Sequence, residues 1–458
     1  MLTQAGIKVA TPLCDLVRRL YPFNYALVGE GNDASIPVMR AELPFKVHEF
    51  SSGAELNGWR IPEAHKVVKA EIRKDGRLVY DGRVSPLGTI MLTEPFQGTI
   101  DLSELKQHLH YSDGDPDAVV FHCVQPYRPG QKTWGFCIPR RLFDSLSEGK
   151  YEVDIKVNRH PSTLKVFDYV LPGAEPETVV LQAHNCHPFQ ANDDISGIAV
   201  GISVLQRLAS RPARRLTYRL IICPELTGTV FWLDSVVANE LSNLRHAIIL
   251  PAVGNDSDLK LQESFTGRAA IDRAARHVFR HRYRTFVSGP FRTIYGNDET
   301  VFEAPGFEIP TISLTRYPFA AYHTDRDTPE QLSEQALEDT ARCVLDICDT
   351  LEHDYALETT HSGLYCLSDP RYSLYKPVWD PSNRAGPKSR EEGRHWNLLM
   401  TCLPRLMDGR TSLVEIADRF ELPIAEVAAY AKKWVDVGLA KRVIADQRAS
   451  PISNAAKS

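Results

Sequence analysis

An alternation of apolar runs and amphipathic helices between about residues 160 and 355 constrains the fold of this chain most strongly. From Asp194 onward, apolar residues recur at helical spacing along one stripe, and Gly197 allows close approach to a neighbouring element. Strands that alternate with helices predict an α/β fold with a mostly parallel sheet flanked by helices. The runs with the length and composition of buried strands are 179–183, 216–223, 246–251 and 311–314.

The remaining sequence predicts further domains around this α/β region. At 458 residues, the chain is longer than a single hydrophobic core usually supports. Short strand-like runs such as 66–73 and 76–82, separated by Gly, Asp and Pro, indicate a β-rich module. We predict an N-terminal part of the α/β domain at 1–46, an inserted β-rich domain at 47–155, the main α/β domain at 156–356, a linker at 357–392, a winged helix at 393–445 and a disordered tail at 446–458.

The predicted winged helix raises the question of nucleic-acid binding. Its helical patterns begin near residues 396, 411 and 424, and an apolar run at 438–444 follows as a wing strand. The helix that would contact DNA has Lys432 and Lys433 as its cations, offset by Glu426 and Asp436. Nucleic-acid binding depends on several phosphate contacts by Lys and Arg. The segment therefore favours packing or homo-oligomer formation over binding to nucleic acid.

Composition excludes several other classes of function. A net charge of -5 offers no electrostatic basis for a membrane surface or nucleic acid as the main partner. No apolar run approaches the roughly 20 residues of a transmembrane helix, and the first residues lack the basic and apolar regions of a signal peptide. The nine cysteines, an odd number without a CxxC pair, predict reduced thiols in a cytoplasmic protein.

Residues that can bind a metal follow three of the predicted strands. His184 ends the first strand and Asp193 opens the next helix, Glu225 follows the second strand, and His323 follows the last. Because parallel strands carry their chemistry at their carboxyl ends, we expect these side chains to converge. Imidazole and carboxylate are usual zinc ligands, so the pattern predicts a metal with a free general base. The alternative is that His184 merely ends a strand and Asp193 caps a helix.

Other polar residues of the same region are candidates for substrate binding. Asp298 and Glu299, in a glycine-bounded loop, are candidates for binding a free amine or replacing a lost metal ligand; the alternative is a solvated turn. Arg316 and Tyr322 are candidates for holding a substrate carboxylate or stabilising an oxyanion. Tyr322 is equally compatible with a pocket wall.

These motifs, in this order, resemble the M28-type zinc aminopeptidases. The resemblance is strongest to a bacterial aminopeptidase-like branch with an inserted β-rich domain and a C-terminal winged helix. It covers nearly the whole chain and assigns 1–46 and 156–356 to a zinc peptidase-like catalytic domain. The segments that carry it are the strand ending in His184, Ala-Asn-Asp-Asp-x-Ser-Gly at 191–197, Pro-Glu-x-x-Gly at 224–228, Tyr-His-Thr-x-x-Asp at 322–327, 58–62, 134–137, 296–299, 304–310 and Arg316.

The resemblance implies a role for each matching residue. His184 corresponds to the first zinc ligand, Asp193 to the carboxylate that bridges two zinc ions, Glu225 to the general base and His323 to the last ligand. The implied activity is hydrolysis of an amide next to a free amine, with zinc polarising the carbonyl and Glu225 deprotonating the water.

The chain departs from the family at three positions. Leu226 stands where a second glutamate ligand is expected, Pro251 where an aspartate ligand is expected, and Cys186 where an aspartate would orient the first histidine. A hydrolytic zinc needs about three protein ligands and a water. His184, Asp193 and His323 supply that number, so we expect one zinc ion rather than two. His187 is the main rival to His184 as first ligand, the alternative being a loop histidine bonded to backbone.

Three functions compete on this basis. The first is a zinc-dependent hydrolase of the aminopeptidase type that acts on a short peptide or related amide. The second is a metal-binding pseudoenzyme or binding module linked to polysaccharide biosynthesis, as relatives in the family are. Leu226 and Pro251 favour this second function, whereas the presence of Glu225 favours the first. The third and weakest is a winged-helix regulator.

Overall fold

The computed structural model describes residues 12–123, 131–376 and 389–443. Two compact units divide the chain: one contains Met1–Gln262 and Val287–Arg342, and the other contains Glu263–Phe286 and Cys343–Ser458. The predicted tail at 446–458 lies outside the described residues. Across those described ranges, no helix has both the length and the apolar character needed to cross a membrane.

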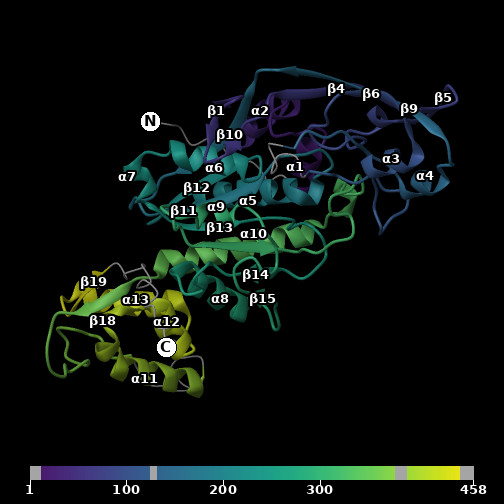
Figure 1. The fold of residues 1–458 in the computed structure, drawn as a ribbon. Helices are drawn as coiled ribbons and strands as arrows, with labels where there is room; N and C mark the ends of the chain where they lie inside the picture. The colour runs from purple at the N-terminus through teal and green to yellow at the C-terminus, as the bar shows by residue number, and fades with distance from the viewer. Residues whose placement is uncertain (1–11, 124–130, 377–388, 444–458) are drawn as a thin grey trace, which may run out of the picture. The chain divides into compact units, whose positions relative to one another are not determined.

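A mixed sheet of eight strands is the centre of the first unit (Figure 1). Its order in the described part of the chain is β1-β10-β12-β11-β13-β16-β14-β15. The middle strands β12, β11, β13 and β16 are parallel, whereas β10 is antiparallel to both β1 and β12. At the other end of the sheet, β14 is antiparallel to β16 and parallel to β15. The predicted α/β fold is therefore confirmed, with its parallel part concentrated at the centre. The strand bounds are β1 Lys46–Ser51, β10 Thr163–Leu171, β11 Thr178–His184, β12 Thr217–Cys223, β13 Leu244–Ile249, β14 Lys260–Gln262, β15 Ser288–Gly289 and β16 Thr311–Thr315.

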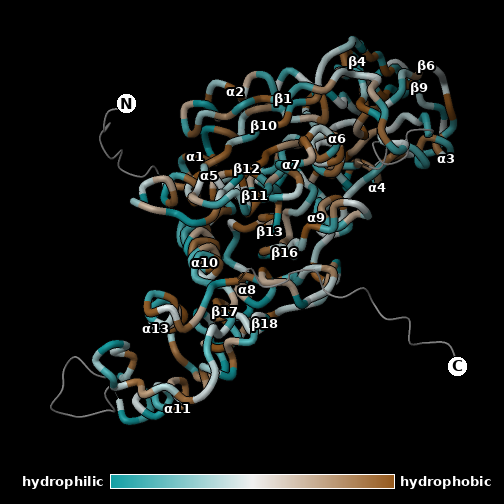
Figure 2. Tube along the Cα trace, turned by 90° about the vertical axis from the view of Figure 1, so that its left-hand side faces the viewer, coloured by the Kyte–Doolittle hydropathy of each residue, from teal (hydrophilic) through white to brown (hydrophobic). Residues whose placement is uncertain are grey.

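The predicted strands are found within a few residues of their expected bounds. Every residue of β11 and of β16 is buried, and in β12 and β13 all residues but one are buried. Figure 2 shows this central part of the chain as largely hydrophobic. Helices cover both faces of such a parallel sheet, which explains why these strands read as continuous apolar runs rather than alternating ones.

Helices lie on both faces of the central strands. Helix α5 (Ser196–Ala209) packs on β11 and β12, where a Cβ atom on Gly201 would come within 2.8 Å of Leu220. The neighbouring residue Ile221 belongs to the opposite face, in a core with Trp232 and Phe302. Those two aromatic residues come from α6 (Thr227–Ser235) and α9 (Glu299–Phe302). The central strands are thus held between two apolar layers.

A second sheet forms the β-rich part of the same unit. Its order is β5-β4-β9-β6, and it has its own apolar core. The predicted bounds of 47–155 differ from those of the sheets, because β1 belongs to the central sheet and β9 continues to His160. The inserted domain, as delimited from sequence, therefore stays a prediction. The strands are β4 Ala64–Lys74, β5 Arg77–Asp81, β6 Phe96–Asp101 and β9 Lys150–His160, beside the short helix α3 Leu102–Leu105.

The second unit contains the helices predicted near the C-terminus. A capping box formed by Ser412 and Glu415 begins α12, as the hydroxyl and early glutamate predict. Strand β17 (Ala356–Thr359), at the start of the stretch predicted as linker, is the middle strand of an antiparallel sheet. The winged-helix assignment stays a prediction. The other elements are α8 Ala270–Arg282, α11 Arg390–Leu406, α12 Leu413–Arg419, α13 Ile424–Asp436, β18 Asp408–Ser412 and β19 Ala440–Val443.

Candidate metal centre

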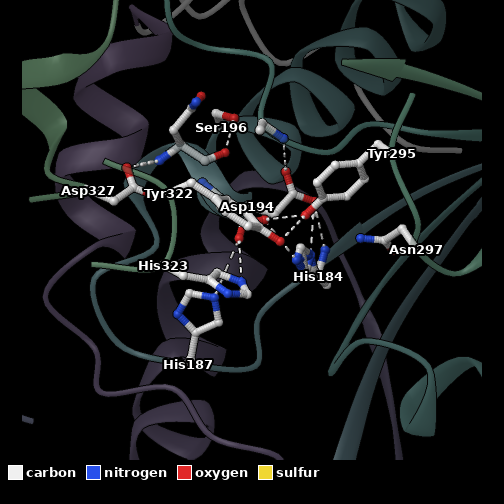
Figure 3. Close-up of polar contacts among 12 residues, drawn as sticks. His184, His187, Asp194, Ser196, Tyr295, Asn297, Tyr322, His323 and Asp327 are labelled. Carbon is white, nitrogen blue, oxygen red and sulfur yellow. Dashed lines mark hydrogen bonds and ion pairs between the residues drawn. The ribbon is translucent and has the colours of Figure 1, made fainter. Parts of the chain in front are cut away.

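Three histidines converge on the carboxylate of Asp193 at the carboxyl edge of the central sheet (Figure 3). Oδ2 of Asp193 lies 3.7 Å from Nε2 of His187 and 3.3 Å from Nε2 of His323. Oδ1 lies 3.2 Å from Nε2 of His184 and accepts a hydrogen bond of 3.3 Å from the hydroxyl of Tyr295. The two oxygens of the carboxylate therefore face different sets of partners.

Two further carboxyl groups hold the turn that carries Asp193. This turn, Ala191–Ile195, precedes α5 and departs from helical geometry at Asp193, which has φ of -111° and ψ of 80°. Asp327 accepts the backbone N–H of Asp193 at 3.0 Å and that of Asn192 at 2.8 Å. Asp194 accepts the N–H of His184 at 3.0 Å. These bonds fix Asp193 relative to the end of β11, independently of any ligand.

The protonation states at the centre suit metal binding. Burial by itself would raise the pKa of Asp193, but the imidazoles of His187 and His323 outweigh burial and hold that pKa below its ordinary value. Burial lowers the pKa of His184 to about 4, against the opposing effect of Asp193. Metals bind ionised carboxylates and neutral imidazoles, and at neutral pH Asp193 is ionised while His184 is neutral.

The atoms that face one another are those a metal would use. Nε2 of His187 and Oδ2 of Asp193 are buried and have no hydrogen-bond partner among the described residues. Nδ1 of His187 lies 2.8 Å from the carbonyl oxygen of Pro188. Since a carbonyl can only accept, Nδ1 carries a proton, so Nε2 is the atom that can offer a lone pair to a metal once it releases any proton that it shares with Asp193. With His323 Nε2 nearby, two imidazoles and a carboxylate form a donor set that fits one divalent ion such as zinc.

Glu225 and His184 lie together on the adjacent side of the centre. Ligand atoms of His184, Cys186 and Glu225 lie within 4.8 Å of one another, as do those of the separate group His187, Asp193 and His323. The predicted residues His184, Asp193, Glu225 and His323 are thus brought together. The sequence left open whether His184 or His187 is the first metal ligand. The geometry favours His187, because its Nε2 faces the same oxygen of Asp193 as Nε2 of His323.

Two of the predicted substrate-binding residues differ in their surroundings. The ring of Tyr322 stacks on His323 with centroids 3.9 Å apart, and its hydroxyl lies 3.2 Å from that of Tyr295. The guanidinium of Arg316 is buried and donates to the carbonyls of Ser257 and Ala336 and to the carboxylate of Asp339. Because these protein groups already accept from the guanidinium, Arg316 stabilises the surrounding structure, and we do not expect it to bind substrate.

The carboxyl groups of Asp298 and Glu299 both accept hydrogen bonds from other groups of the protein. Asp298 accepts hydrogen bonds from the Leu226 N–H and from Gln182, and both oxygens of Glu299 accept the N–H of Asn297. Both carboxyl groups are buried, and burial raises the pKa of each. They are interior groups, so the alternative of a solvated turn is wrong and binding of a substrate amine is not supported.

Asn297 is the residue of this loop that points toward the centre, beside His184 in Figure 3. Its side-chain oxygen accepts the N–H of Asp298 at 2.7 Å, which identifies the other terminal atom as the amide nitrogen. That nitrogen is buried and lacks a hydrogen-bond partner in the part of the chain that the structure describes. An unsatisfied buried donor costs about 1–3 kcal/mol, so it indicates a place for an acceptor.

Sequence reasoning missed Asn297, Tyr295 and Phe121. The first two adjoin Gly296, and the glycine-bounded motif signalled that loop without showing which residue turns inward. Phe121 comes from the β-rich part of the chain; its ring stacks on His187 with centroids 4.1 Å apart, and its N–H donates to the carbonyl of His323 at 2.7 Å. No local pattern marks Phe121, because its role depends on a contact with residues far along the chain.

A cavity of about 400 Å³ adjoins the centre. His187, Cys186 and Phe121 form the wall nearest the candidate ligands. The other lining residues are His160, Pro188 and most residues of the segments 24–31, 64–67 and 82–92. The cavity thus lies between the β-rich part of the chain and the loop that follows β11, and His187 is the candidate ligand in its wall.

A third cluster of metal-binding residue types lies in the second unit and is better explained as an ion pair. It consists of His277 and His281 on α8 and Asp418 on α12. Nδ1 of His277 lies 2.6 Å from Oδ1 of Asp418, and Arg280 contacts the other oxygen at 3.1 Å. Two zinc ligands in tetrahedral geometry lie roughly 3.3 Å apart, so the 2.6 Å contact is a hydrogen bond.

Comparisons with known proteins agree with the fold. Residues 14–354 match the family model described as a domain of unknown function (DUF4910). A Clostridium acetobutylicum protein named "Putative polysaccharide biosynthesis protein with aminopeptidase-like domain" is 26% identical over 435 residues, covering 94% of this chain and 96% of that protein.

Solved structures show the same architecture. The crystal structure of a "putative peptidase" from Clostridium acetobutylicum has a TM-score of 0.75 at 24% identity, covering 94% of this chain and 96% of its own. A zinc aminopeptidase from Bacillus subtilis has a TM-score of 0.56 at 15% identity, covering 73% of this chain and 93% of its own. The predicted aminopeptidase-like fold is confirmed.

Proposed function

This chain belongs to the DUF4910 family, and from its aminopeptidase-like fold and its histidine-carboxylate centre we propose that it is a metal-dependent hydrolase of the peptidase type. The observation that carries the proposal is the group His187, Asp193 and His323, whose possible ligand atoms lie within 4.8 Å of one another. Two of these atoms, Nε2 of His187 and Oδ2 of Asp193, are buried without a hydrogen-bond partner among the described residues. If these residues served only to stabilise the fold, these buried atoms would remain without hydrogen-bond partners, which costs free energy.

We propose that His187, Asp193 and His323 hold a single zinc ion. Asp193 would bind through Oδ2, while Oδ1 stays engaged by His184 and Tyr295. His184 would then contact Oδ1 of Asp193 instead of acting as the predicted first ligand. In many metal sites, residues that contact a ligand in this way orient it toward the metal. Zinc held there would polarise a substrate carbonyl and lower the pKa of a water to roughly 7.

The protein groups around the ion divide the remaining tasks. Glu225 would take the proton of the attacking water and return it to the leaving amine. The amide nitrogen of Asn297 would donate a hydrogen bond to an oxygen of the substrate or transition state. Tyr322 and Phe121 would hold His323 and His187 through ring stacking.

A short peptide or a related amide is the substrate class we propose. The cavity beside His187 has a volume of about 400 Å³, within the range of small-molecule sites. Segments of the β-rich part line it, which restricts the length of a bound chain. The Clostridium acetobutylicum relative is named as a putative polysaccharide biosynthesis protein, so we include amides of amino sugars among the candidate substrates.

The test combines metal analysis with Glu225→Gln. Wild-type protein should bind zinc and hydrolyse at least one member of a panel of aminoacyl amides and amino-sugar amides, with loss of activity on chelation. Glu225→Gln should bind zinc equally well but lower kcat by about 10²- to 10⁴-fold, the usual contribution of a general base. Glu358→Gln, on β17, serves as a control.

Two outcomes would reject the hydrolase. One is purification of a stable protein with no affinity for zinc, and the other is hydrolysis that Glu225→Gln leaves unchanged. Zinc binding without hydrolysis of any amide in the panel would instead favour the metal-binding pseudoenzyme.

A further inference from the structure

The peptide bond that follows Glu225 is held at both of its polar ends. Its carbonyl oxygen, which belongs to Glu225, accepts the N–H of Thr227 at 2.6 Å. Its N–H, which belongs to Leu226, donates to Oδ1 of Asp298 at 2.9 Å. The direction in which the chain leaves Glu225 therefore depends on a residue 72 positions away in sequence.

This peptide lies in a strained turn. Leu226 has φ of 56° and ψ of -63°, and with the bond from Thr227 to Glu225 this is a γ-turn of the rare form. Such conformations cost on the order of 1–3 kcal/mol and persist where surrounding structure determines them. Gly228 is required as well, because a Cβ atom there would lie 2.5 Å from Cβ of Cys223. The turn thus depends on tertiary contacts rather than on the preference of leucine.

Asp298 joins this turn to the strand that leads to the histidines. Its second oxygen, Oδ2, accepts the side-chain amide of Gln182 at 3.0 Å. Gln182 lies in β11, two residues before His184, and both it and Asp298 are fully buried. A single carboxyl group therefore cross-links the end of β11 to the loop after β12.

We propose that Asp298 is a positioning residue that orients Glu225 toward the metal centre by accepting the Leu226 N–H and the Gln182 amide. The inference rests on the proposed function in one respect, namely that Glu225 is the base. Both oxygens of Asp298 are used and neither is exposed, so the role replaces the predicted contact with a substrate amine.

Two substitutions at Asp298 separate positioning from a general structural role. Asp298→Ala removes both acceptors, and we expect kcat to fall about 10- to 100-fold through misplacement of Glu225. The KM for the same amide should stay within about threefold, because binding contacts are unaffected. Zinc content should be unchanged, since no proposed ligand contacts Asp298.

Asp298→Asn should restore function. The asparagine oxygen can accept the Leu226 N–H. Its amide nitrogen can donate to Oε1 of Gln182 if the Gln182 amide turns over, since Nε2 faces this position in wild type and Oε1 has no hydrogen-bond partner within the described ranges. We expect kcat within about threefold of wild type, because both cross-links are kept. As a matched control, Asp272→Ala removes another buried carboxyl that accepts backbone N–H groups, at Ser264 and Ala269. It should lower stability and leave kcat unchanged.

Hydrogen exchange tests the cross-link without any substrate. In wild type, the Leu226 amide should exchange as slowly as the amides of β12, and Asp298→Ala should speed exchange at Leu226 while β12 stays protected. Rapid exchange at Leu226 in wild type would overturn the proposal, even if Asp298→Ala fails to fold. Wild-type kcat in a folded Asp298→Ala variant, or equal impairment in Asp298→Asn, would also overturn it. The effect of Glu225→Gln on activity is a separate measurement, so failure of the cross-link can be distinguished from failure of the proposed function.

Discussion

Replacing His187 by alanine should weaken zinc binding much more than replacing His184. His187 Nε2 lies 3.7 Å from Oδ2 of Asp193, and His323 Nε2 lies 3.3 Å from the same oxygen. Zinc bonds of about 2.0–2.1 Å in tetrahedral geometry separate two ligands by roughly 3.3 Å. His184 contacts the other oxygen, Oδ1, which Tyr295 also engages. For this reason we propose His187 as a ligand and His184 as a support of Asp193.

The expected magnitudes follow from these two roles. Four-ligand zinc sites bind with about 10–16 kcal/mol, or roughly 3–4 kcal/mol per ligand. Loss of His187 should therefore weaken zinc binding by about 100- to 1000-fold. Loss of a supporting residue costs about 10- to 100-fold, and for His184 we expect the lower end, because Tyr295 still holds Oδ1.

A competition titration against a chromophoric zinc chelator measures both affinities, and elemental analysis gives the stoichiometry. Wild type should bind one zinc ion per chain. His353→Ala, a histidine bonded to the carbonyl of Asp349 on helix α10 (Glu334–His353), is the control and should bind as wild type does. Equal affinity of His187→Ala and wild type, or a greater loss in His184→Ala, would refute the assignment. Two ions bound with similar affinity would refute the single-ion site.

Two further predictions concern groups around the centre. Tyr295→Phe removes the hydroxyl that donates to Oδ1 of Asp193 and should weaken zinc binding by about tenfold in the same titration; unchanged affinity would count against this support. Burial raises the pKa of Asp298 from 3.8 to about 7, so the folded chain keeps a proton that the unfolded chain releases between about pH 4 and 7. This carboxyl therefore favours folding most at low pH, and its contribution is lost as the pH rises toward 7. In urea unfolding of zinc-free wild type, this carboxyl should lower the free energy of unfolding by up to about 4 kcal/mol over that pH interval. Asp298→Asn should remove this decrease. The same pH dependence of the unfolding free energy in both proteins would contradict the reasoning.

The central sheet was predictable because its signal is local. Apolar runs such as 179–183 and 216–223 have the period and composition of buried strands, and the structure has β11 and β12 there. The order of His184, Asp193, Glu225 and His323 after successive strands similarly predicts convergence, since parallel strands end at one edge. Neither inference requires knowledge of how the loops run.

The sequence by itself therefore determined the class of fold, the edge of the sheet that bears the centre and the residue types available there. The tertiary structure decided which atoms meet. Tyr295 reaches Asp193 across 102 positions, and Asp298 reaches Leu226 across 72. Such contacts depend on loop paths and burial, which no short window of sequence encodes. For that reason only the tertiary structure leads to the proposals that His187 is a ligand and that Asp298 is a cross-link instead of a substrate residue.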